Sequence, residues 1–171
     1  MRSKTVRWTW AIGSMLLVVA LGPSLASADI QAFMKIPGVA GESTNEQHKG
    51  EIDLLSYSQS VTPSVGDGAC FKVTVVKNLD RTSPVFAAFV ALEKVLMVTI
   101  TLAQTGANPR DIFTAVLENT IITSVELVEV DGTPLPTERL TLQPTRARIS
   151  FVPQKPDGSS DGAVQKVINC L

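Results

Sequence analysis

Residues Phe33–Tyr57 read FMKIPGVAGESTNEQHKGEIDLLSY, and most of the interpretation starts from this segment. It has a short apolar run at 33–36, a polar run with several glycines at 38–50, and a second strand-like run at 52–57. The middle run is too polar for a core and longer than the roughly 4 to 6 residues of an ordinary connection. Connections of that length tend to be functional or disordered, so we expect a surface loop that makes contacts.

Alternating apolar residues around this segment predict further strands. The clearest is 96–102, where Leu96, Val98, Ile100 and Leu102 alternate with more polar residues. Short runs of this kind recur between turns rich in Gly, Pro and Asp, and aromatic residues make up only 5% of the chain. About nine short strands follow from this pattern, at 33–36, 52–57, 69–76, 96–102, 111–117, 121–130, 138–142, 147–152 and 164–171. The pattern predicts a mainly β protein, either a barrel or a sandwich.

One helix is expected, at about 84–94. Ser83 is a candidate N-cap, and Pro84 fits the first helical position, where its missing N–H costs nothing. The segment is apolar around most of its circumference. Such a helix is buried against the β core, against a neighbouring subunit, or against both.

Residues 1–28 have the features of a secretory signal peptide. A basic start with Arg2, Lys4 and Arg7 precedes the apolar run 10–21, and Ala26-Ser27-Ala28 forms a small-residue cleavage site. The alternatives are an uncleaved anchor or a wrongly assigned start. Cleavage near Ala28 predicts a single domain, 29–171, secreted to the periplasm or the extracellular space.

Charge and hydropathy exclude two classes of partner. The chain has 15 basic and 16 acidic residues, and three basic but no acidic ones lie in 1–28, which leaves 12 against 16. An acidic surface gives no electrostatic reason to bind nucleic acid. No apolar run after the leader has the length of about 20 residues needed to span a membrane.

The two cysteines, Cys70 and Cys170, both lie in the predicted exported portion. In an oxidising compartment they can form an intramolecular disulfide, remain as two free thiols, or link two subunits. The sequence leaves these three states open.

The residues show no recognisable catalytic or cofactor motif. His48 is the sole histidine, so a hydrolase with a histidine base would depend on it, and it lies in a polar loop without a nucleophile motif. Glu42, Glu46 and His48 match no zinc or calcium spacing. We therefore expect a protein without enzymatic activity, cofactor or metal.

The opening segment resembles haemolysin-coregulated proteins (Hcp), the tube subunits of type VI secretion. The motifs that carry the resemblance are FMKIPGVAGEST and HKGEIDLLSYS, and weaker similarity extends over 33–164. The weaker matches are Phe71-Lys72-Val73, DRTSPVF at 80–86, 96–102, 112–117, Pro136-Thr137-Glu138 and FVPQKPDGSSDG at 151–162.

This resemblance implies a small β-barrel of two sheets with one helix, assembled into hexameric rings. Such rings stack into tubes, carry effector proteins in the pore and work with the secretion apparatus. The resemblance assigns the contact between rings or subunits to Gly41, Glu42, Ser43, Thr44, His48 and Lys49. An alternative is an exported monomeric binding or adhesion domain that uses the loop at 38–50.

Overall fold

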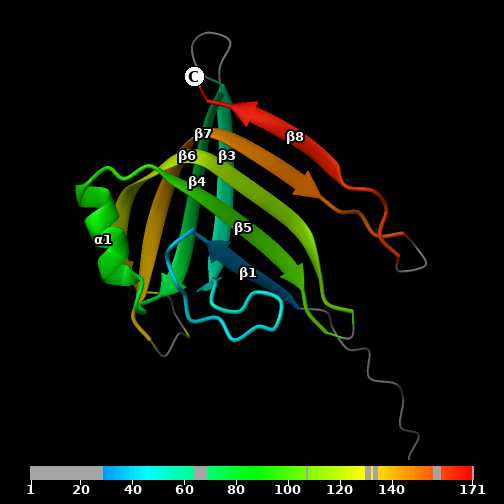
Figure 1. Ribbon diagram of the computed structural model, residues 1–171, viewed down its shortest axis with the longest axis horizontal. Coiled ribbons are helices and arrows are strands. Elements are labelled where there is room, and N and C mark those ends of the chain that lie inside the picture. The colour runs from blue at the N-terminus through cyan, green and yellow to red at the C-terminus, as the bar shows by residue number, and fades with distance from the viewer. Residues whose placement is uncertain are drawn as a thin grey trace, which may run out of the picture.

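The computed structural model describes residues 29–63, 69–106, 108–129, 132, 135–155 and 159–170; the predicted leader, 1–28, lies outside them. The described residues form eight strands and one helix (Figure 1). The strands are β1 (Ile30–Lys35), β2 (Ile52–Leu54), β3 (Ser56–Pro63), β4 (Ala69–Asn78), β5 (Leu96–Gln104), β6 (Arg110–Val128), β7 (Thr137–Phe151) and β8 (Val164–Asn169); the helix is α1 (Ser83–Ala91). The expectation of a mainly β fold with one helix is confirmed.

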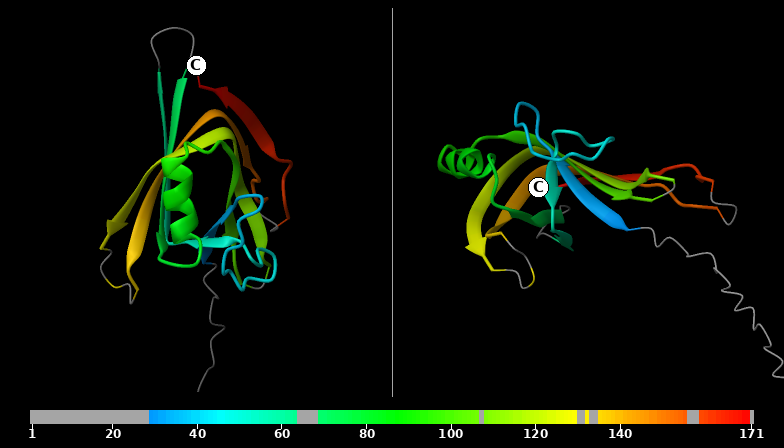
Figure 2. Two further views of the ribbon diagram at one scale, coloured as in Figure 1. Left: turned by 60° about the vertical axis from the view of Figure 1, so that its left-hand side comes forward. Right: turned by 90° about the horizontal axis from the view of Figure 1, so that it is seen from below.

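The strands form one antiparallel sheet that curls into a half-barrel, where two sheets were expected (Figure 2). The strand order is β2-β1-β5-β6-β7-β4-β3, and β8 pairs with β7 beyond the end of the β4 pairing. Leu55 N donates a hydrogen bond to Val76 O at 2.7 Å, which joins the end of β2 to β4. The sheet therefore wraps around a single interior.

The core lies inside the curl and comes from alternate residues of the strands. In β5, Leu96, Val98 and Ile100 are buried, as the alternation at 96–102 predicts, but Leu102 is only half-buried because the register shifts between Leu102 and Ala103. The other strands contribute in the same way, with Met34, Ile52, Phe71, Val73, Val75, Ala115, Leu117, Leu140, Leu142 and Ala147. In the described part of the chain, no helix has the length and apolar character needed to cross a membrane.

Two expected interruptions are absent, because the strands continue through them. The expected gap between the strands 111–117 and 121–130 lies inside β6, where Asn119 has a positive φ of 47° but pairing with β7 resumes at Thr120. Likewise the expected gap between the strands 138–142 and 147–152 lies inside β7, where Pro144 pairs with Thr120. The local breaks in the strand pattern are overridden because β6 and β7 pair with each other along most of their length.

The helix is shorter than expected and starts differently. It spans Ser83–Ala91; its N-cap is Thr82, whose side chain makes no capping hydrogen bond, so the prediction of Ser83 as the cap is wrong. The helix ends before Glu93, whose φ of 46° is incompatible with its continuation. Helix α1 packs on one flank of the half-barrel, and Phe86 is the helix residue that reaches the core (Figure 2).

Candidate functional site

The polar run between β1 and β2 is a folded lobe, which we call the 38–50 loop. Its two sides are joined by backbone hydrogen bonds: Gly41 N donates to Gly50 O at 2.8 Å, and Gly50 N donates to Ser43 O at 2.9 Å. Ser43 N donates to Glu51 O at 3.0 Å, just before β2. Figure 1 shows the lobe in cyan below β1. Its backbone conformation is therefore defined by its own pairing.

Gly41 is required by the close approach of these two sides. A Cβ atom on Gly41 would lie 2.1 Å from Glu51 O and 2.7 Å from Ile52 N. These are backbone atoms, which cannot move away without breaking the pairing. The glycine of the VAGEST motif therefore has a steric reason to be there.

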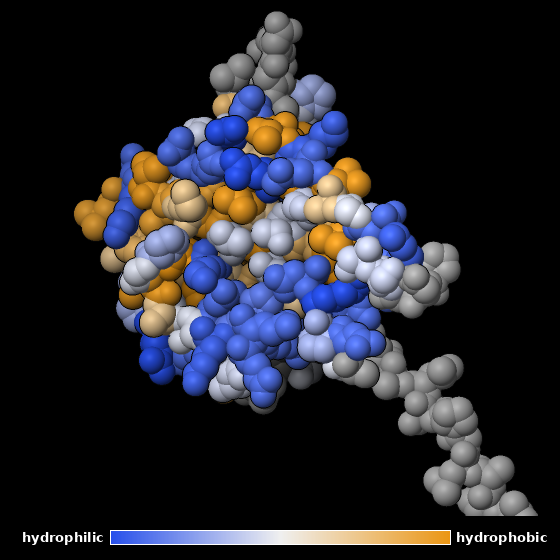
Figure 3. Space-filling model, turned by 45° about the vertical axis from the view of Figure 1, so that its right-hand side comes forward, coloured by the Kyte–Doolittle hydropathy of each residue, from blue (hydrophilic) through white to orange (hydrophobic). Residues whose placement is uncertain are grey.

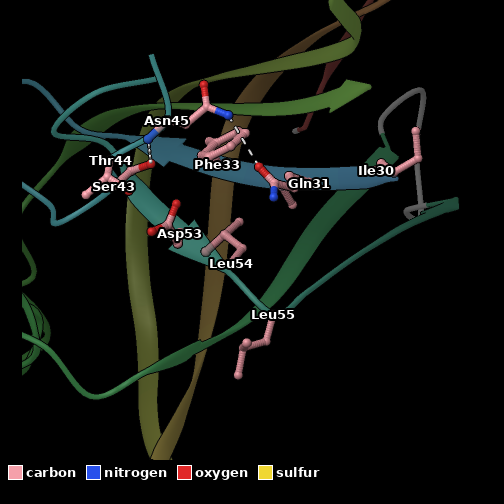
Figure 4. Close-up of a pocket in the computed structure, with 10 residues that line it drawn as sticks. Ile30, Gln31, Phe33, Ser43, Thr44, Asn45, Asp53, Leu54 and Leu55 are labelled. Carbon is pink, nitrogen blue, oxygen red and sulfur yellow. Dashed lines mark hydrogen bonds between the residues drawn. The ribbon is translucent and has the colours of Figure 1, made fainter. Parts of the chain in front are cut away.

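Asn45 shapes the tip of the loop. Its Oδ1 accepts hydrogen bonds from Gln47 N at 3.0 Å and His48 N at 3.3 Å. Its own N donates to Ser43 Oγ at 3.3 Å, and its Nδ2 donates to Gln31 Oε1 on β1 at 3.3 Å (Figure 4). One asparagine thus folds the tip and ties it to the neighbouring strand.

His48 points from the loop onto the outer face of the sheet. Its ring stacks on Phe33 of β1, with the ring centroids 4.1 Å apart and the planes 13° from parallel. Nδ1 lies 3.0 Å from Glu51 Oε2, and Nε2 lies 3.0 Å from Asp111 Oδ1 at the start of β6. Only 6% of the side chain is exposed. His48 therefore joins the loop to β1 and to β6.

Two further ion pairs fasten the loop. Lys35 Nζ of β1 lies 3.5 Å from Glu51 Oε1. Arg81 Nε, just before α1, donates to Glu42 Oε1 at 2.8 Å. The Arg81 and Glu42 side chains are largely exposed, and exposed pairs contribute only about 0 to 1 kcal/mol each. The buried histidine is thus the stronger anchor.

The six residues that the sequence assigns to the loop contact fall into two groups. Glu42, Thr44 and Lys49 are exposed, whereas Gly41, Ser43 and His48 are buried. A buried side chain offers little surface to a partner, so we assign His48 to the internal support of the loop and not to direct contact. The exposed members keep their predicted role as contact residues.

Sequence reasoning missed two of the partners of His48. Phe33 was interpreted as part of an apolar strand, although its ring faces outward onto the histidine. Asp111 lies 63 positions further along the chain, and no spacing rule connects it to the loop. The only available signal was that the sole histidine of the chain lies among polar residues close to Glu51.

A cleft of about 510 Å³ lies beside the loop (Figure 4). Asp53 of β2 and Thr44 of the loop supply polar groups, while Leu54 and Leu55 supply an apolar edge. The remaining lining comes from Ile30, Gln31, Ala32, Phe33, Ser43 and Asn45. The cleft is a surface hollow formed by the same elements that hold the loop.

The chemistry available at His48 is limited by its contacts. Both ring nitrogens already lie at hydrogen-bond distance from carboxylates, so neither faces a nucleophile or an open space. Among the described residues, no group of three or more His, Cys, Asp and Glu side chains is placed to hold a metal ion. The arrangement suits a structural role.

A second buried cluster supports α1. Lys77 of β4 has no exposed surface, and its Nζ lies 2.8 Å from Glu138 Oε1 of β7 and 2.9 Å from Asp80 Oδ1. Nζ also donates to Asn78 O at 2.8 Å and to Ser83 Oγ at 3.3 Å. Ser83 Oγ in turn donates to Glu138 Oε1 at 2.8 Å. The cluster ties the first turn of α1 to two strands.

The ionisation of Asp80 follows from these contacts. Burial by itself raises the pKa of Asp80, but hydrogen bonds from Thr82 and Lys77 outweigh burial and hold the pKa below its ordinary value. Thr82 Oγ1 donates to Asp80 Oδ1 at 2.6 Å, and Thr82 N donates to the same oxygen at 2.7 Å. The folded turn before α1 therefore stabilises the ionised form of Asp80.

Exposed apolar side chains gather on two opposite flanks. The α1 flank carries Leu92, Val95 and Met97, and the β8 flank carries Phe151, Val164 and Val167, with exposed fractions from 45% to 74%. Figures 1 and 2 show α1 and β8 on opposite sides of the half-barrel. Figure 3 shows apolar side chains across the upper part of one face, above a predominantly polar lower surface. Each of the two flanks therefore carries exposed apolar side chains.

The cysteines are described only in part. Cys170, after β8, is half-buried and free, and its Sγ accepts a hydrogen bond from Phe71 N at 3.1 Å. The backbone of Cys70 belongs to β4, but its side chain lies outside the described residues. The prediction of a disulfide between the two cysteines stays open.

The fold is that of type VI secretion proteins with solved structures. A structure described as a type six secretion system protein superposes with a TM-score of 0.73 at 17% identity, covering 82% of this chain and 96% of that chain. Hcp1 from Salmonella typhimurium gives 0.68 at 20% identity, covering 82% and 94%. A type VI secretion system effector from Yersinia pestis gives 0.66 at 24% identity, covering 81% and 98%.

Sequence similarity shows the family. The family described as "Type VI secretion system effector, Hcp" matches residues 33–151. Protein hcp1 of Pseudomonas aeruginosa is 28% identical over 149 residues, which is 80% of this chain and 92% of that protein. The chain belongs to the Hcp family of type VI secretion proteins.

Proposed function

We propose that the chain is a non-enzymatic subunit that assembles with itself into hexameric rings, which stack into tubes and carry effector proteins. The observation that carries the proposal is the pair of apolar surfaces on opposite flanks. A contact between two different surfaces is head-to-tail, and it forms a closed ring when the rotation per subunit closes. The number six, the stacking and the cargo come from the family resemblance.

Helix α1 supplies the strongest reason to expect a neighbour on its flank. Its sequence, SPVFAAFVA, has no charged residue, and Ala87, Ala88 and Ala91 are exposed on its outer side. A helix that is apolar all round is normally buried on several sides. In a ring, the β8 flank of the next subunit would cover this helix.

The 38–50 loop supplies the proposed contact along the tube axis. Glu42, Thr44 and Lys49 offer charges of both signs and a hydroxyl at its surface. A polar contact of this kind adds specificity and register more than affinity. Apolar flanks would therefore hold each ring together, and the loop would set how rings meet.

Complementary variants test the head-to-tail contact. Leu92→Asp disables the α1 flank and Phe151→Asp disables the β8 flank, so each variant alone should be monomeric by light scattering. Mixed in equal amounts, they should give dimers and nothing larger, because one intact surface of each kind remains. Val61→Asp, at an exposed apolar residue of β3 that belongs to neither set of flank residues, is the matched control and should leave rings visible by negative-stain microscopy. Rings from either flank variant alone would disprove the proposed interface.

A second candidate function is a monomeric binding domain that captures a ligand beside the loop. The cleft of about 510 Å³ between the loop, β1 and β2 is the observation that favours it. Deleting the loop tip should abolish ligand capture under this hypothesis, whereas under the ring hypothesis it should abolish stacking and leave single rings. A wild-type protein that stays monomeric at micromolar concentration would favour the binding domain.

We also propose that the mature chain begins near Asp29 and is secreted. The basic, apolar and small-residue segments of 1–28 support this. N-terminal sequencing of protein recovered from the periplasm should find Asp29 at or next to the start. Recovery of uncleaved chain from the cytoplasm alone would contradict it.

A disulfide between Cys70 and Cys170 is part of the same proposal. The Cys170 thiol lies against Phe71 N, one residue from Cys70, which supports it. In the chain-entropy model, closing a loop of about 100 residues stabilises the folded state by up to about 4 to 5 kcal/mol. Intact mass should rise by about 2 Da on reduction of the purified protein, from the two hydrogens that thiol formation adds. An unchanged mass and two reactive thiols in denaturant would exclude the disulfide.

A further inference from the structure

The positions of the two carboxylates around His48 indicate how many protons its imidazole ring carries. Nδ1 and Nε2 each lie 3.0 Å from a carboxylate oxygen, of Glu51 and Asp111 respectively. An ionised carboxylate only accepts hydrogen bonds. Neutral imidazole carries one N–H, whereas imidazolium carries two. Both contacts are therefore hydrogen bonds only when the ring is doubly protonated.

The charged groups around the ring favour the same form. Glu51 faces it from the segment before β2, Asp111 from β6, and Lys35 of β1 approaches Glu51 at 3.5 Å. With an imidazolium these four groups sum to zero charge. With a neutral ring they leave one excess negative charge beside a mostly buried side chain. The remaining contact, Phe33 of β1, is uncharged.

The contact with Asp111 reaches outside the loop. Most of the other described hydrogen bonds of the loop stay within it or run to Glu51, directly before β2. Its remaining side-chain ties, from Asn45 to Gln31 and from Glu42 to Arg81, are exposed. His48 is thus the buried link between the loop and the sheet.

We propose that His48 is a positioning residue that holds the 38–50 loop on the outer face of the sheet in its imidazolium form, so that loop attachment depends on one proton. When the ring loses a proton, one nitrogen lone pair faces a carboxylate oxygen. That contact changes from a charge-assisted hydrogen bond to a repulsion. Attachment is therefore strongest while the ring holds both protons and both carboxylates are ionised, and it weakens when the ring loses one proton. The inference goes beyond the proposed function, because it concerns one subunit and holds with or without rings.

The single histidine allows a direct test on the mature protein. With selective ¹⁵N-histidine labelling, NMR should find protons on both ring nitrogens at every pH where the hydrogen-bonded loop amides of Ser43, His48 and Gly50 are protected from hydrogen exchange. As pH rises, proton loss and faster loop exchange should share one midpoint, after exchange rates are corrected for their intrinsic pH dependence. The corrected rate should increase about ten- to a hundredfold, the factor for losing one charge-assisted hydrogen bond.

Two variants separate the proton effect from a general loosening. In Asp111→Asn, the amide can donate to a neutral ring nitrogen, so the loop should stay protected while its pH dependence disappears. Glu126→Gln, on the same strand but paired with Arg139 and not with the ring, is the matched control and should behave like the wild type. Three results would each overturn the inference. The first is a ring that carries one proton while the loop is still protected from exchange. The others are a corrected loop exchange rate that does not change when the ring loses its proton, and equal effects of the two variants. None of these readouts requires ring formation.

Discussion

The cluster around Lys77 and the cluster around His48 both place charge inside the protein, but they do so differently. Lys77 is fully buried, with two carboxylates and two neutral oxygens around one ammonium group. His48 is covered by the loop to which it belongs, and its partner Asp111 is half-exposed. The first cluster is part of the core, whereas the second fastens a surface element to it.

Because of this difference, the Lys77 cluster affects the stability of the whole fold, whereas the His48 cluster affects the position of a surface loop. Breaking a buried ion pair leaves an uncompensated charge and destabilises the whole fold. Loosening a surface loop costs only the free energy of a local opening. The Lys77 cluster supports α1 and hence the apolar flank, while the His48 cluster supports the proposed stacking contact. The two proposed interfaces can therefore be perturbed separately.

The largest effect is expected from Lys77→Met. The substitution leaves Glu138, which is 1% exposed, without its counter-charge, and should lower the free energy of unfolding by about 3 to 5 kcal/mol. Urea denaturation measures it. The double variant Lys77→Met/Glu138→Leu should recover part of the loss, because no unpaired charge remains on β7. A double variant less stable than the single one would contradict this account.

Gly41→Ala should have the next largest effect and should act in the loop. The new Cβ would lie 2.1 Å from Glu51 O, so the backbone must separate at a cost of about 2 kcal/mol. Hydrogen exchange should accelerate at 41–51 first. Gly162→Ala is the matched control, since a Cβ there meets nothing within 4 Å, and should change stability by less than about 0.5 kcal/mol.

Phe33→Leu should separate the stability of the loop from that of the core. It removes the stacking partner of His48 but keeps an apolar side chain on β1. Loss of the aromatic contact should cost about 1 kcal/mol. Loop exchange should rise while the urea midpoint moves little. An equal loss of global stability and loop protection would show that the loop and the core unfold as one unit.

The smallest effect concerns Asp80, where burial opposes hydrogen bonding. Because its pKa is lowered in the folded state, Asp80 contributes stability above the ordinary carboxyl pKa of 3.8, and this is lost as pH falls through the folded value. Thr82→Val removes a hydrogen bond that lowers this pKa, so the acid loss should be smaller and should be complete at a higher pH. Unfolding free energies measured across the acid range would show the shift. Identical profiles for wild type and Thr82→Val would contradict it.

Local patterns sufficed for much of the fold. The alternation at 96–102 predicted β5 and its buried face as far as Ile100, and Pro84 predicted the start of α1 to within one residue. The same reasoning failed at 118–120 and 143–146, where it ended strands that continue, because the strand pattern is local, whereas the pairing of β6 with β7 joins distant residues. For the loop, its position and polarity were predictable, but its attachment to Asp111 was not.

The sequence by itself determined that the protein is mainly β, that one apolar helix lies among the strands, and that a polar loop follows the first strand. Composition and residue periodicity carry that information because strands and helices repeat over a few positions. Only the tertiary structure decided that the sole histidine packs on the outer face of the sheet between two carboxylates, and that exposed apolar residues lie on two opposite flanks. These features depend on how a curled sheet brings together residues many positions apart, which no local pattern records.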